Sequence, residues 1–382
     1  MTKKILVIGM LDSVHLGRWL TQFNQENLDF IIMPSKKFRR IHPLIKSLTQ
    51  SSSNFKFANF FYKYRFAGYI DFAIYEVLYK LFKLNLRINF LNKILLGHEF
   101  FRIHALELQG AGYLCLDWSL KYKKEFDDKL ILTNWGSDIY HFYHDENHLL
   151  KIQGVLKISR YYSAECVRDY DLATRFGFKG VFLPCNPNSG GIEIPVEQNL
   201  SQTSLRNNII VKGYGGNFGR SNLLIPILNK ILTDFPLIDI FYYSVTPDIE
   251  ILILDQINQF PKRIDYSTIK NSLTHNELLF KFRNARIYIG LSTSDGISTS
   301  FLEALCTGAY PIQSNTSCAD EWVSLGIIAS IVNLDSFEIE NQIRNALMDD
   351  KYVDDSAVNN LEVAANRLNY KKVKRDSLKF YY

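Results

Sequence analysis

Two carboxylic acids with seven residues between them, Asp295 and Glu303, mark the segment RIYIGLSTSDGISTSFLEALCTGAYPIQS (286–314). The segment predicts a strand, a short polar loop and a helix that starts near Ser298. Unpaired N–H groups and the helix dipole at such a start favour an anion, and Gly296 lets the backbone approach it. Carboxylates beside a phosphate site suit hydroxyl groups, such as those of a sugar and a ribose. The alternative is that both acids have only structural roles, with Asp295 capping the helix and Glu303 lying on a surface helix.

Two cations, Lys212 and Arg220, lie in a second segment, IIVKGYGGNFGRSNLL (209–224), which predicts a strand, a glycine-rich loop and a helix. A diphosphate leaving group gains negative charge as its bond to a sugar breaks. Fixed cations stabilise that charge without a metal. The glycines do not form the G-x-G-x-x-G pattern, so we favour a diphosphate site over a dinucleotide site.

The surrounding chain predicts the alternating strands and helices of an α/β protein. In the first half, strands are expected at 4–10 and 30–35, and in the apolar runs 112–118, 130–136, 154–159 and 180–185. In the second half, they are expected at 208–214, 238–245, 286–292, 309–314 and 327–333. The polar, turn-rich stretch 186–207 between the halves is typical of an interdomain connection.

The segment STSDGISTSFLEALCTGAYPI (292–312) resembles the E-x7-E signature of retaining glycosyltransferases with the GT-B fold, family GT4. Asp295 stands where the family usually has its first Glu. The positions that agree are Glu303, Ala304, Gly308 and Pro311. The resemblance is strong over about 208–325 and weaker over 1–200.

This resemblance implies an α/β chain of GT-B type, with two Rossmann-like domains facing each other across a cleft. Residues 1–195 would bind the acceptor and carry an aromatic and basic insertion at about 36–96. Residues 205–360 would bind the nucleotide-sugar. A helix in 361–382 would pack back on the N-terminal domain.

The resemblance also implies roles for single residues. Glu303 would bind the ribose hydroxyls and Asp295 would contact the transferred sugar. Lys212 and Arg220 would stabilise the leaving diphosphate, in the reverse of the family's order. A UDP- or GDP-linked donor would also be held at Gly213, Gly296, Ile297, Ser298 and Thr299. No metal ion and no cofactor is expected.

The N-terminal half is expected to hold the acceptor. His15 and Arg18 follow the first predicted strand, and Trp135 and Asp138 follow another, so all four are candidate acceptor contacts. The segments 103–114 and 132–142 also resemble N-terminal segments of the family. By this likeness, His104 would lie beside the transferred sugar as a catalytic residue. A packed, hydrogen-bonded histidine is the alternative at His104 and at His15.

Two patterns imitate metal sites. HFYHDENH (141–148) has three histidines at helical spacing but no evident fourth ligand, so a surface helix start is favoured. DYD (169–171) lies in a predicted amphipathic helix, which argues against a metal role.

Charge and aromatic residues gather in the N-terminal part. Residues 1–100 carry 15 Lys and Arg against 6 Asp and Glu, a net charge of +9, and residues 55–82 hold 12 aromatics. Such a mixture suits an anionic membrane surface. Core packing and single-stranded nucleic acid are the alternatives, and the resemblance decides against nucleic acid. The sequence has no apolar run long enough to cross a membrane, and its five cysteines fit a reducing compartment.

We therefore expect a retaining, hexosyltransferase-like glycosyltransferase. It would move a sugar from a nucleotide-sugar to a lipid-linked or glycan acceptor in the synthesis of bacterial surface polysaccharide (LPS, O-antigen or capsule). It would be cytoplasmic and peripheral at the inner face of the cytoplasmic membrane. The alternatives are a nucleotide-sugar epimerase of the same fold and a non-catalytic, membrane-associated protein that binds a nucleotide-sugar.

Overall fold

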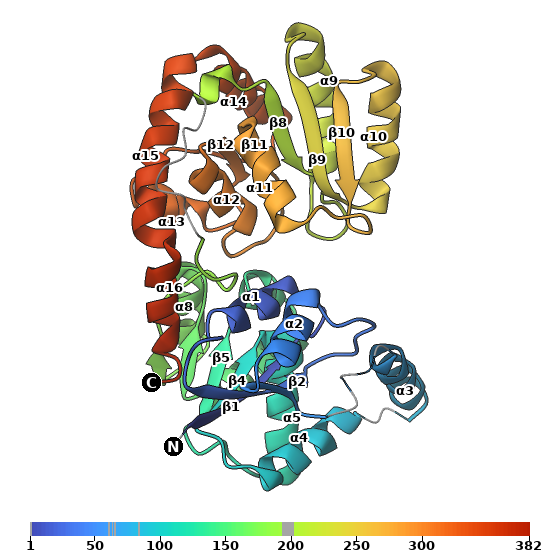
Figure 1. Ribbon diagram of the computed structural model, residues 1–382, viewed down its shortest axis with the longest axis vertical. Coiled ribbons are helices and arrows are strands. Elements are labelled where there is room, and N and C mark those ends of the chain that lie inside the picture. The colour runs from blue at the N-terminus through green and yellow to red at the C-terminus, as the bar shows by residue number, and fades with distance from the viewer. Residues whose placement is uncertain (1, 60–61, 63, 65, 83–84, 193–201) are drawn as a thin grey trace. The chain divides into compact units, whose positions relative to one another are not determined.

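The computed structural model describes residues 2–59, 62, 64, 66–82, 85–192 and 202–382, and Figure 1 labels many of its elements. Contacts divide the chain into two compact units. Unit 1 comprises Met1–Gly191 and Lys371–Tyr382, and unit 2 comprises Ile192–Tyr370. Part of the predicted interdomain connection, residues 193–201, lies outside the described residues. Among the helices that are described, none combines the length and the apolar character needed to cross a membrane.

Unit 1 is built on a parallel sheet of seven described strands in the order β3-β2-β1-β4-β5-β6-β7. The strands are β1 (Lys3–Gly9), β2 (Leu28–Pro34), β3 (Phe55–Phe57), β4 (Arg102–Leu106), β5 (Leu130–Thr133), β6 (Tyr161–Ser163) and β7 (Val181–Phe182). The helices are α1 (Val14–Thr21), α2 (Pro43–Ser51), α3 (Ala67–Phe82), α4 (Leu86–Gly97), α5 (Tyr113–Tyr122), α6 (Ser137–Tyr140), α7 (Glu146–Ile158), α8 (Val167–Arg175) and α16 (Tyr370–Leu378), with a π-helical turn at Leu108–Gly112 and a 3-10 turn at Phe142–His144.

Unit 2 is built on a parallel sheet of six strands among its described residues, in the order β10-β9-β8-β11-β12-β13. The strands are β8 (Asn208–Lys212), β9 (Asp239–Val245), β10 (Ile264–Thr268), β11 (Ala285–Gly290), β12 (Tyr310–Ser314) and β13 (Ser330–Val332). The helices are α9 (Leu224–Asp234), α10 (Pro247–Gln259), α11 (His275–Arg283), α12 (Thr299–Thr307), α13 (Ala319–Val323), α14 (Ser336–Met348) and α15 (Asp350–Leu368), with 3-10 turns at Thr203–Leu205 and Ser221–Leu223.

Both sheets are covered by helices on their two faces (Figure 1). Along β1, Leu6 and Ile8 pack into one core while Ile5 and Val7 pack into the other. Successive side chains of a strand point to opposite faces, so a strand buried on both sides is apolar throughout. This is why the sequence shows near-continuous apolar runs rather than alternation.

The strand order reverses beside the first strand of each sheet. The reversal lies between β1 and β4 in unit 1, and between β8 and β11 in unit 2. Loops that leave two such strands run in opposite directions, and α/β sheets bind ligands at the carboxyl ends of the strands there. The loops after β8 and β11 are the two segments that the sequence singled out.

Two apolar runs predicted as strands are helical. GYLCLDW (112–118) forms most of α5, and GVLKIS (154–159) completes α7. The strand that lies between β1 and β5 in the sheet is β4, which the sequence analysis did not predict. A short apolar run has the same composition in a buried strand and in a buried helix, so its periodicity does not separate the two.

The last residues of the chain are part of the core of unit 1. Tyr381 has no exposed surface and Phe380 only 2%. Their rings contact Trp19 and Phe23. The C-terminal segment therefore completes the packing of the N-terminal sheet.

Candidate functional site

Backbone hydrogen bonds join the loops that follow β8 and β11. Thr293 N donates to Phe218 O (2.8 Å), and Gly219 and Ser292 form an antiparallel bridge. The two polar segments of the sequence thus meet at the switch point of the sheet in unit 2. One side carries the predicted cations and the other carries the predicted acids.

Two glycines allow the path of the loop after β8. A Cβ atom on Gly219 would lie 1.9 Å from Tyr214 O, so only glycine fits at this position. Gly216 has a φ of 66°, a region that glycine adopts without strain. Its N–H donates to Asp248 Oδ2 (3.1 Å). The loop is therefore held close to the sheet. A ligand at the carboxyl ends of the strands can then contact the backbone of the loop.

Lys212 and Arg220 lie at the two ends of this loop. Lys212 is the half-buried last residue of β8, and its Nζ lies 5.7 Å from the ring centroid of Tyr214. The Nη1 of Arg220 donates to the loop carbonyls of Gly216 (3.3 Å) and Gly219 (2.6 Å). Arg220 thus stabilises the loop and places a positive charge beside it. Gly213, which follows Lys212, is buried.

Helix α12 starts directly after the acidic loop. Its N-cap residue, Ser298, makes no side-chain capping hydrogen bond; its hydroxyl lies 3.4 Å from Tyr288 Oη instead. Ser298 is therefore not the capping partner of the first-turn N–H groups, which leaves that helix end suited to an anion. Ile297 is buried beside it and Thr299 is half-buried.

Asp295 is half-buried in the loop before α12. Its Oδ1 accepts a hydrogen bond from Gly296 N (2.9 Å), and its own N–H donates to Thr316 O (3.3 Å). The carboxylate is thus positioned by the loop itself, at the same edge of the sheet as the cations.

Glu303 is buried one turn inside α12, with 3% of its surface exposed. Its Oε1 lies 2.8 Å from the Nε2 of His275. His275 is the first residue of α11, whose start is defined by a capping box between Thr274 and Glu277. Glu303 is therefore not the acid of a surface helix. His275 was not singled out from the sequence, although the T-H-N-E pattern marks the helix start on which it lies.

His104 is not at a surface, and the prediction that it lies beside a sugar is wrong for this structure. It has no exposed area. Its Nδ1 lies 2.7 Å from Tyr381 Oη and its Nε2 lies 2.7 Å from Thr133 Oγ1. Burial lowers the pKa of His104 to about 3, so the ring is a neutral part of the core. The packed-histidine alternative is the correct one.

The other predicted residues of unit 1 lie at the carboxyl edge of its sheet. The rings of His15 and Trp135 are in edge contact, with centroids 5.3 Å apart, and Arg18 is half-buried on α1. Asp138 Oδ2 accepts from Leu108 N (2.9 Å) and Trp135 N (3.2 Å). Burial, and then the nearby carboxylate of Glu107, raise the pKa of Asp138 to about 7.

Glu107 is a second residue that the sequence did not single out. It follows β4, is 1% exposed and has a φ of 126°, which is rare for a side-chain-bearing residue. Its carboxylate accepts a hydrogen bond from the Ser35 hydroxyl and pairs with Lys36 Nζ (2.8 Å). An acid placed directly after a buried strand is the signal that could have found it.

One residue of each pattern that imitates a metal site has structural contacts. His148 Nδ1 lies 2.9 Å from Tyr113 Oη, at the start of α7. Asp169 is completely buried on α8, where it pairs with Arg168 Nε (2.9 Å) and accepts from Asn134 Nδ2 (2.7 Å). Within either unit, the described residues gather no group of three metal-ligating side chains.

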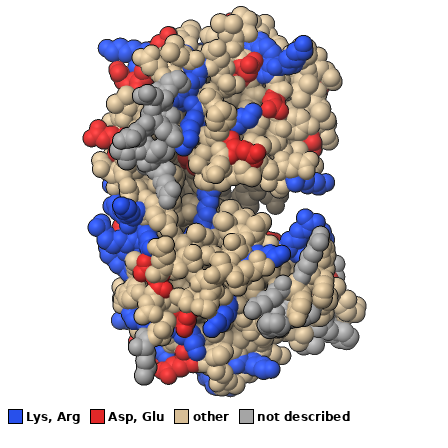
Figure 2. All heavy atoms as spheres, in the orientation of Figure 1, with Lys and Arg blue, Asp and Glu red and all other residues tan. Residues whose placement is uncertain are grey.

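Figure 2 shows basic and acidic side chains mixed over the visible face of unit 2. The overall charge of that face therefore does not mark a ligand site. The loops after β8 and β11 stand out by their local geometry instead.

No protein-family profile matches the chain, and no curated protein matches its sequence significantly. Solved structures do match. Sucrose-phosphate synthase from Thermosynechococcus elongatus superposes with a TM-score of 0.72 at 13% identity, over 99% of this chain and 98% of that chain. HepE from Anabaena, in complex with UDP-glucose, gives 0.66 at 12% identity over 98% of both chains. A putative UDP-N-acetylglucosamine 2-epimerase from Listeria monocytogenes gives 0.62 at 10% identity, over 98% of this chain and 94% of that chain. At sequence identities of 10% to 13%, these matches establish the fold but not the function. With its two helix-covered parallel sheets of seven and six described strands, the chain has the GT-B fold that its resemblance to glycosyltransferases implied.

Proposed function

We propose that the chain is a glycosyltransferase that takes its sugar from a nucleotide-sugar donor. One observation carries this proposal: the cationic loop after β8, the start of α12 and the buried Glu303 lie at one switch point of the sheet in unit 2. A diphosphate needs cations and N–H groups, and a ribose needs a hydrogen-bond acceptor. The complex of the structural neighbour HepE with UDP-glucose supports this reading.

In this proposal the predicted residues of unit 2 have separate tasks. The start of α12 and the backbone at Gly213 and Gly296 bind the diphosphate, together with Lys212 and Arg220. Glu303 accepts hydrogen bonds from the ribose hydroxyls, with His275 positioning its carboxylate. Asp295 contacts the sugar that is transferred. The donor is a UDP- or GDP-linked hexose.

The reaction would retain the configuration of the sugar. The bond between the anomeric carbon and the diphosphate oxygen breaks while an acceptor hydroxyl forms its bond on the same face. The proton of that hydroxyl passes to the leaving diphosphate oxygen. Lys212, Arg220 and the amides of α12 stabilise the charge that develops on the diphosphate.

The acceptor would be a lipid-linked or glycan molecule of a bacterial surface polysaccharide, such as LPS, O-antigen or capsule. The protein would work at the inner face of the cytoplasmic membrane as a peripheral protein. The charge of +9 over residues 1–100 supports this location, because cationic segments are attracted to anionic lipids.

An epimerase acting on a nucleotide-sugar is a second candidate, because a putative UDP-N-acetylglucosamine 2-epimerase shares the fold. The two functions differ in their need for an acceptor. Incubation with the nucleotide-sugar alone would give an isomeric nucleotide-sugar if the chain is an epimerase. A transferase would give no isomer.

The proposal is tested by a thermal-shift panel of UDP, GDP and their sugar conjugates. A ligand at 100 times its Kd adds about 2.7 kcal/mol to the free energy of unfolding. We expect stabilisation by one nucleotide and its conjugates. If no nucleotide or nucleotide-sugar stabilises the protein, the proposal is wrong.

A further inference from the structure

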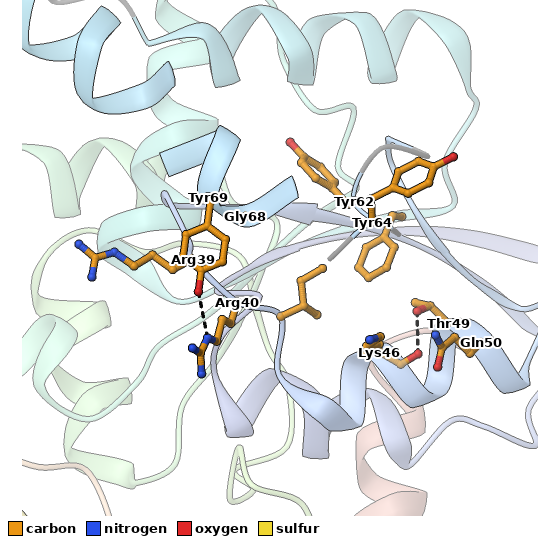
Figure 3. A pocket seen from close by; sticks show the side chains of 11 residues that line it. Arg39, Arg40, Lys46, Thr49, Gln50, Tyr62, Tyr64, Gly68 and Tyr69 are labelled. Atoms are coloured by element: carbon orange, nitrogen blue, oxygen red, sulfur yellow. Dashed lines mark hydrogen bonds between the residues drawn. The ribbon is translucent and has the colours of Figure 1, made fainter. Parts of the chain in front are cut away.

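A pocket of about 510 Å³ lies in unit 1 between α2 and the start of α3 (Figure 3). This volume is in the range of small-molecule sites. The polar and charged residues in its wall include Arg39, Arg40, Lys46, Thr49, Gln50 and Tyr69. None of the described residues that line it is an Asp or a Glu. The pocket is therefore suited to an anion.

The charged groups are spread around the pocket. Figure 3 shows Arg40 and Tyr69 on one side of it and Lys46, Thr49 and Gln50 on the other. Arg40 Nε donates to Tyr69 Oη (3.3 Å). The guanidinium of Arg39 lies instead 4.4 Å from the ring centroid of Phe72. Arg39 also lines the pocket, but its guanidinium packs on Phe72, so among the described lining residues we take Arg40 and Lys46 as the cations that a ligand would meet.

The wall of the pocket is built on the core of unit 1. A Cβ atom on Gly68 would lie 2.3 Å from Arg39 O, so the first turn of α3 rests directly on that backbone. Tyr62 is 8% exposed and packs edge-on against Phe38 and Phe57, with centroids 5.5 Å and 6.4 Å apart. These contacts position the pocket relative to the sheet.

An apolar stripe runs from the pocket along α3. Its members recur every three or four residues, which places them on one side of the helix. They are Phe66, Ile70, Ile74, Val77 and Leu81, with 54%, 39%, 48%, 53% and 70% of their surface exposed. On another side of α3, Asp71 pairs with Arg87 of α4. A helix that is anchored in this way and exposes an apolar side is typical of a surface that meets lipid.

We propose that the pocket binds the phosphate-bearing head of an anionic lipid whose hydrocarbon chain lies along this stripe. The inference rests on the proposed function, because it assigns the place at which unit 1 engages the anionic lipid of the membrane. Arg40 and Lys46 neutralise the phosphate, and the hydroxyls of Thr49 and Tyr69 lie beside it. A water-soluble phosphate would satisfy the cations but leave the stripe exposed. Single-stranded nucleic acid stacks on aromatic rings. Four of the five residues in the stripe are aliphatic, so the stripe favours a hydrocarbon chain over nucleic-acid bases.

Flotation with vesicles tests the proposal. The vesicles contain phosphatidylcholine alone or phosphatidylcholine with about 30 mol % phosphatidylglycerol, an anionic lipid of the cytoplasmic leaflet type. The wild-type chain is expected to bind the anionic vesicles. The double variant R40Q/K46Q should bind them about thirtyfold more weakly, from about 1 kcal/mol for each cation at the surface.

Two matched control variants show whether vesicle binding depends on these particular residues. One control tests the loss of positive charge elsewhere, and the other tests the loss of exposed apolar side chains elsewhere. K124Q/K179Q removes two exposed cations elsewhere in unit 1 and should bind like the wild type. I74S/V77S should lose vesicle binding, whereas L120S/L150S, which alters two exposed leucines outside the stripe, should keep it. An equal loss in both charge variants, or no binding by the wild type, would overturn the proposal. The proposal would also be overturned if a single-stranded oligonucleotide displaced the protein from the vesicles and bound to it only when Arg40 and Lys46 were present.

Binding of UDP distinguishes this inference from the proposed function. R40Q/K46Q should be stabilised by UDP as strongly as the wild type, because the pocket is not part of the donor site. Vesicle binding without UDP binding would contradict the proposed function alone. UDP binding without vesicle binding would contradict the lipid site alone.

Discussion

The Nε2 of His275 lies 2.8 Å from the Oε1 of Glu303, which joins the first residue of α11 to a buried carboxylate in α12. A carboxylate with 3% exposure needs a polar partner. His275 is such a partner in this structure, and in our proposal the ribose hydroxyls of the donor are others. In our proposal, the pair therefore couples the packing of unit 2 to the binding of a nucleotide.

Replacing His275 by Ala should lower the free energy of unfolding of unit 2 by about 1.5–3 kcal/mol, because Glu303 loses a charge-assisted hydrogen bond. Urea unfolding followed by circular dichroism measures this change. H144A, which alters an exposed histidine of unit 1, is the control and should unfold like the wild type. Equal stability of H275A and the wild type would show that the contact contributes nothing.

Replacing Glu303 by Gln should weaken UDP binding by about tenfold or more, because hydrogen bonds to a charged acceptor are worth about 1.5–3 kcal/mol. Calorimetric titration with UDP measures the affinity. E362Q changes an exposed acid on α15 and should leave the affinity unchanged. An unaltered affinity in E303Q would remove Glu303 from the donor site.

Replacing Asp295 by Asn should reduce sugar transfer by about a hundredfold or more, the size of effect found when one polar group of a transition-state site is removed. UDP affinity should change little, because Asp295 is assigned to the sugar and not to the nucleotide. Transfer is measured with radiolabelled donor, and D255N, at an exposed position of α10, is the control. Full transfer by D295N would contradict the role and favour a non-catalytic protein.

The free energy of unfolding should fall as the pH drops below about 6.5, in part because of His104. Its pKa is about 3 in the folded chain against an ordinary value of 6.5, as a result of burial. Since the unfolded chain binds this proton first, the stability contributed by neutral His104 is complete above 6.5 and declines towards pH 3. The expected loss between pH 7 and pH 5 is about 2 kcal/mol. Urea unfolding of the wild type and H104Q at both pH values tests this, and an equal loss in both proteins would refute it.

Replacing Tyr381 by Phe should destabilise unit 1 by about 1–3 kcal/mol. Its hydroxyl accepts a hydrogen bond from Trp19 Nε1 (3.0 Å) and lies 2.7 Å from His104 Nδ1, so both buried nitrogens would lose a partner. Tyr382, with 59% of its surface exposed, provides the matched control Y382F. A melting temperature of Y381F equal to that of Y382F would show that this network adds no stability.

Local patterns in the sequence were sufficient to predict the strand, loop and helix around Asp295 and Glu303. The strand is apolar, the loop is polar, and Gly308 ends the helix, so each residue type agrees with its backbone. The run GYLCLDW was misread because buried strands and buried helices share their composition. The resemblance to a family implied the GT-B fold, which the structure confirms.

The contacts of single side chains could not be predicted in the same way. His104 lies in the middle of β4 and is part of the core, whereas His275 begins α11 and pairs with a buried acid. Tyr381 is the partner of His104 from 277 positions away. Such contacts depend on how distant elements pack, and the sequence pattern around each residue does not contain that information.

A crystal structure of the chain with UDP tests the central claim most directly. We predict that the diphosphate lies at the N-terminus of α12, beside Lys212 and Arg220, with the ribose hydroxyls in contact with Glu303. Density for UDP at any other place, without contact between the ribose and Glu303, would contradict the account.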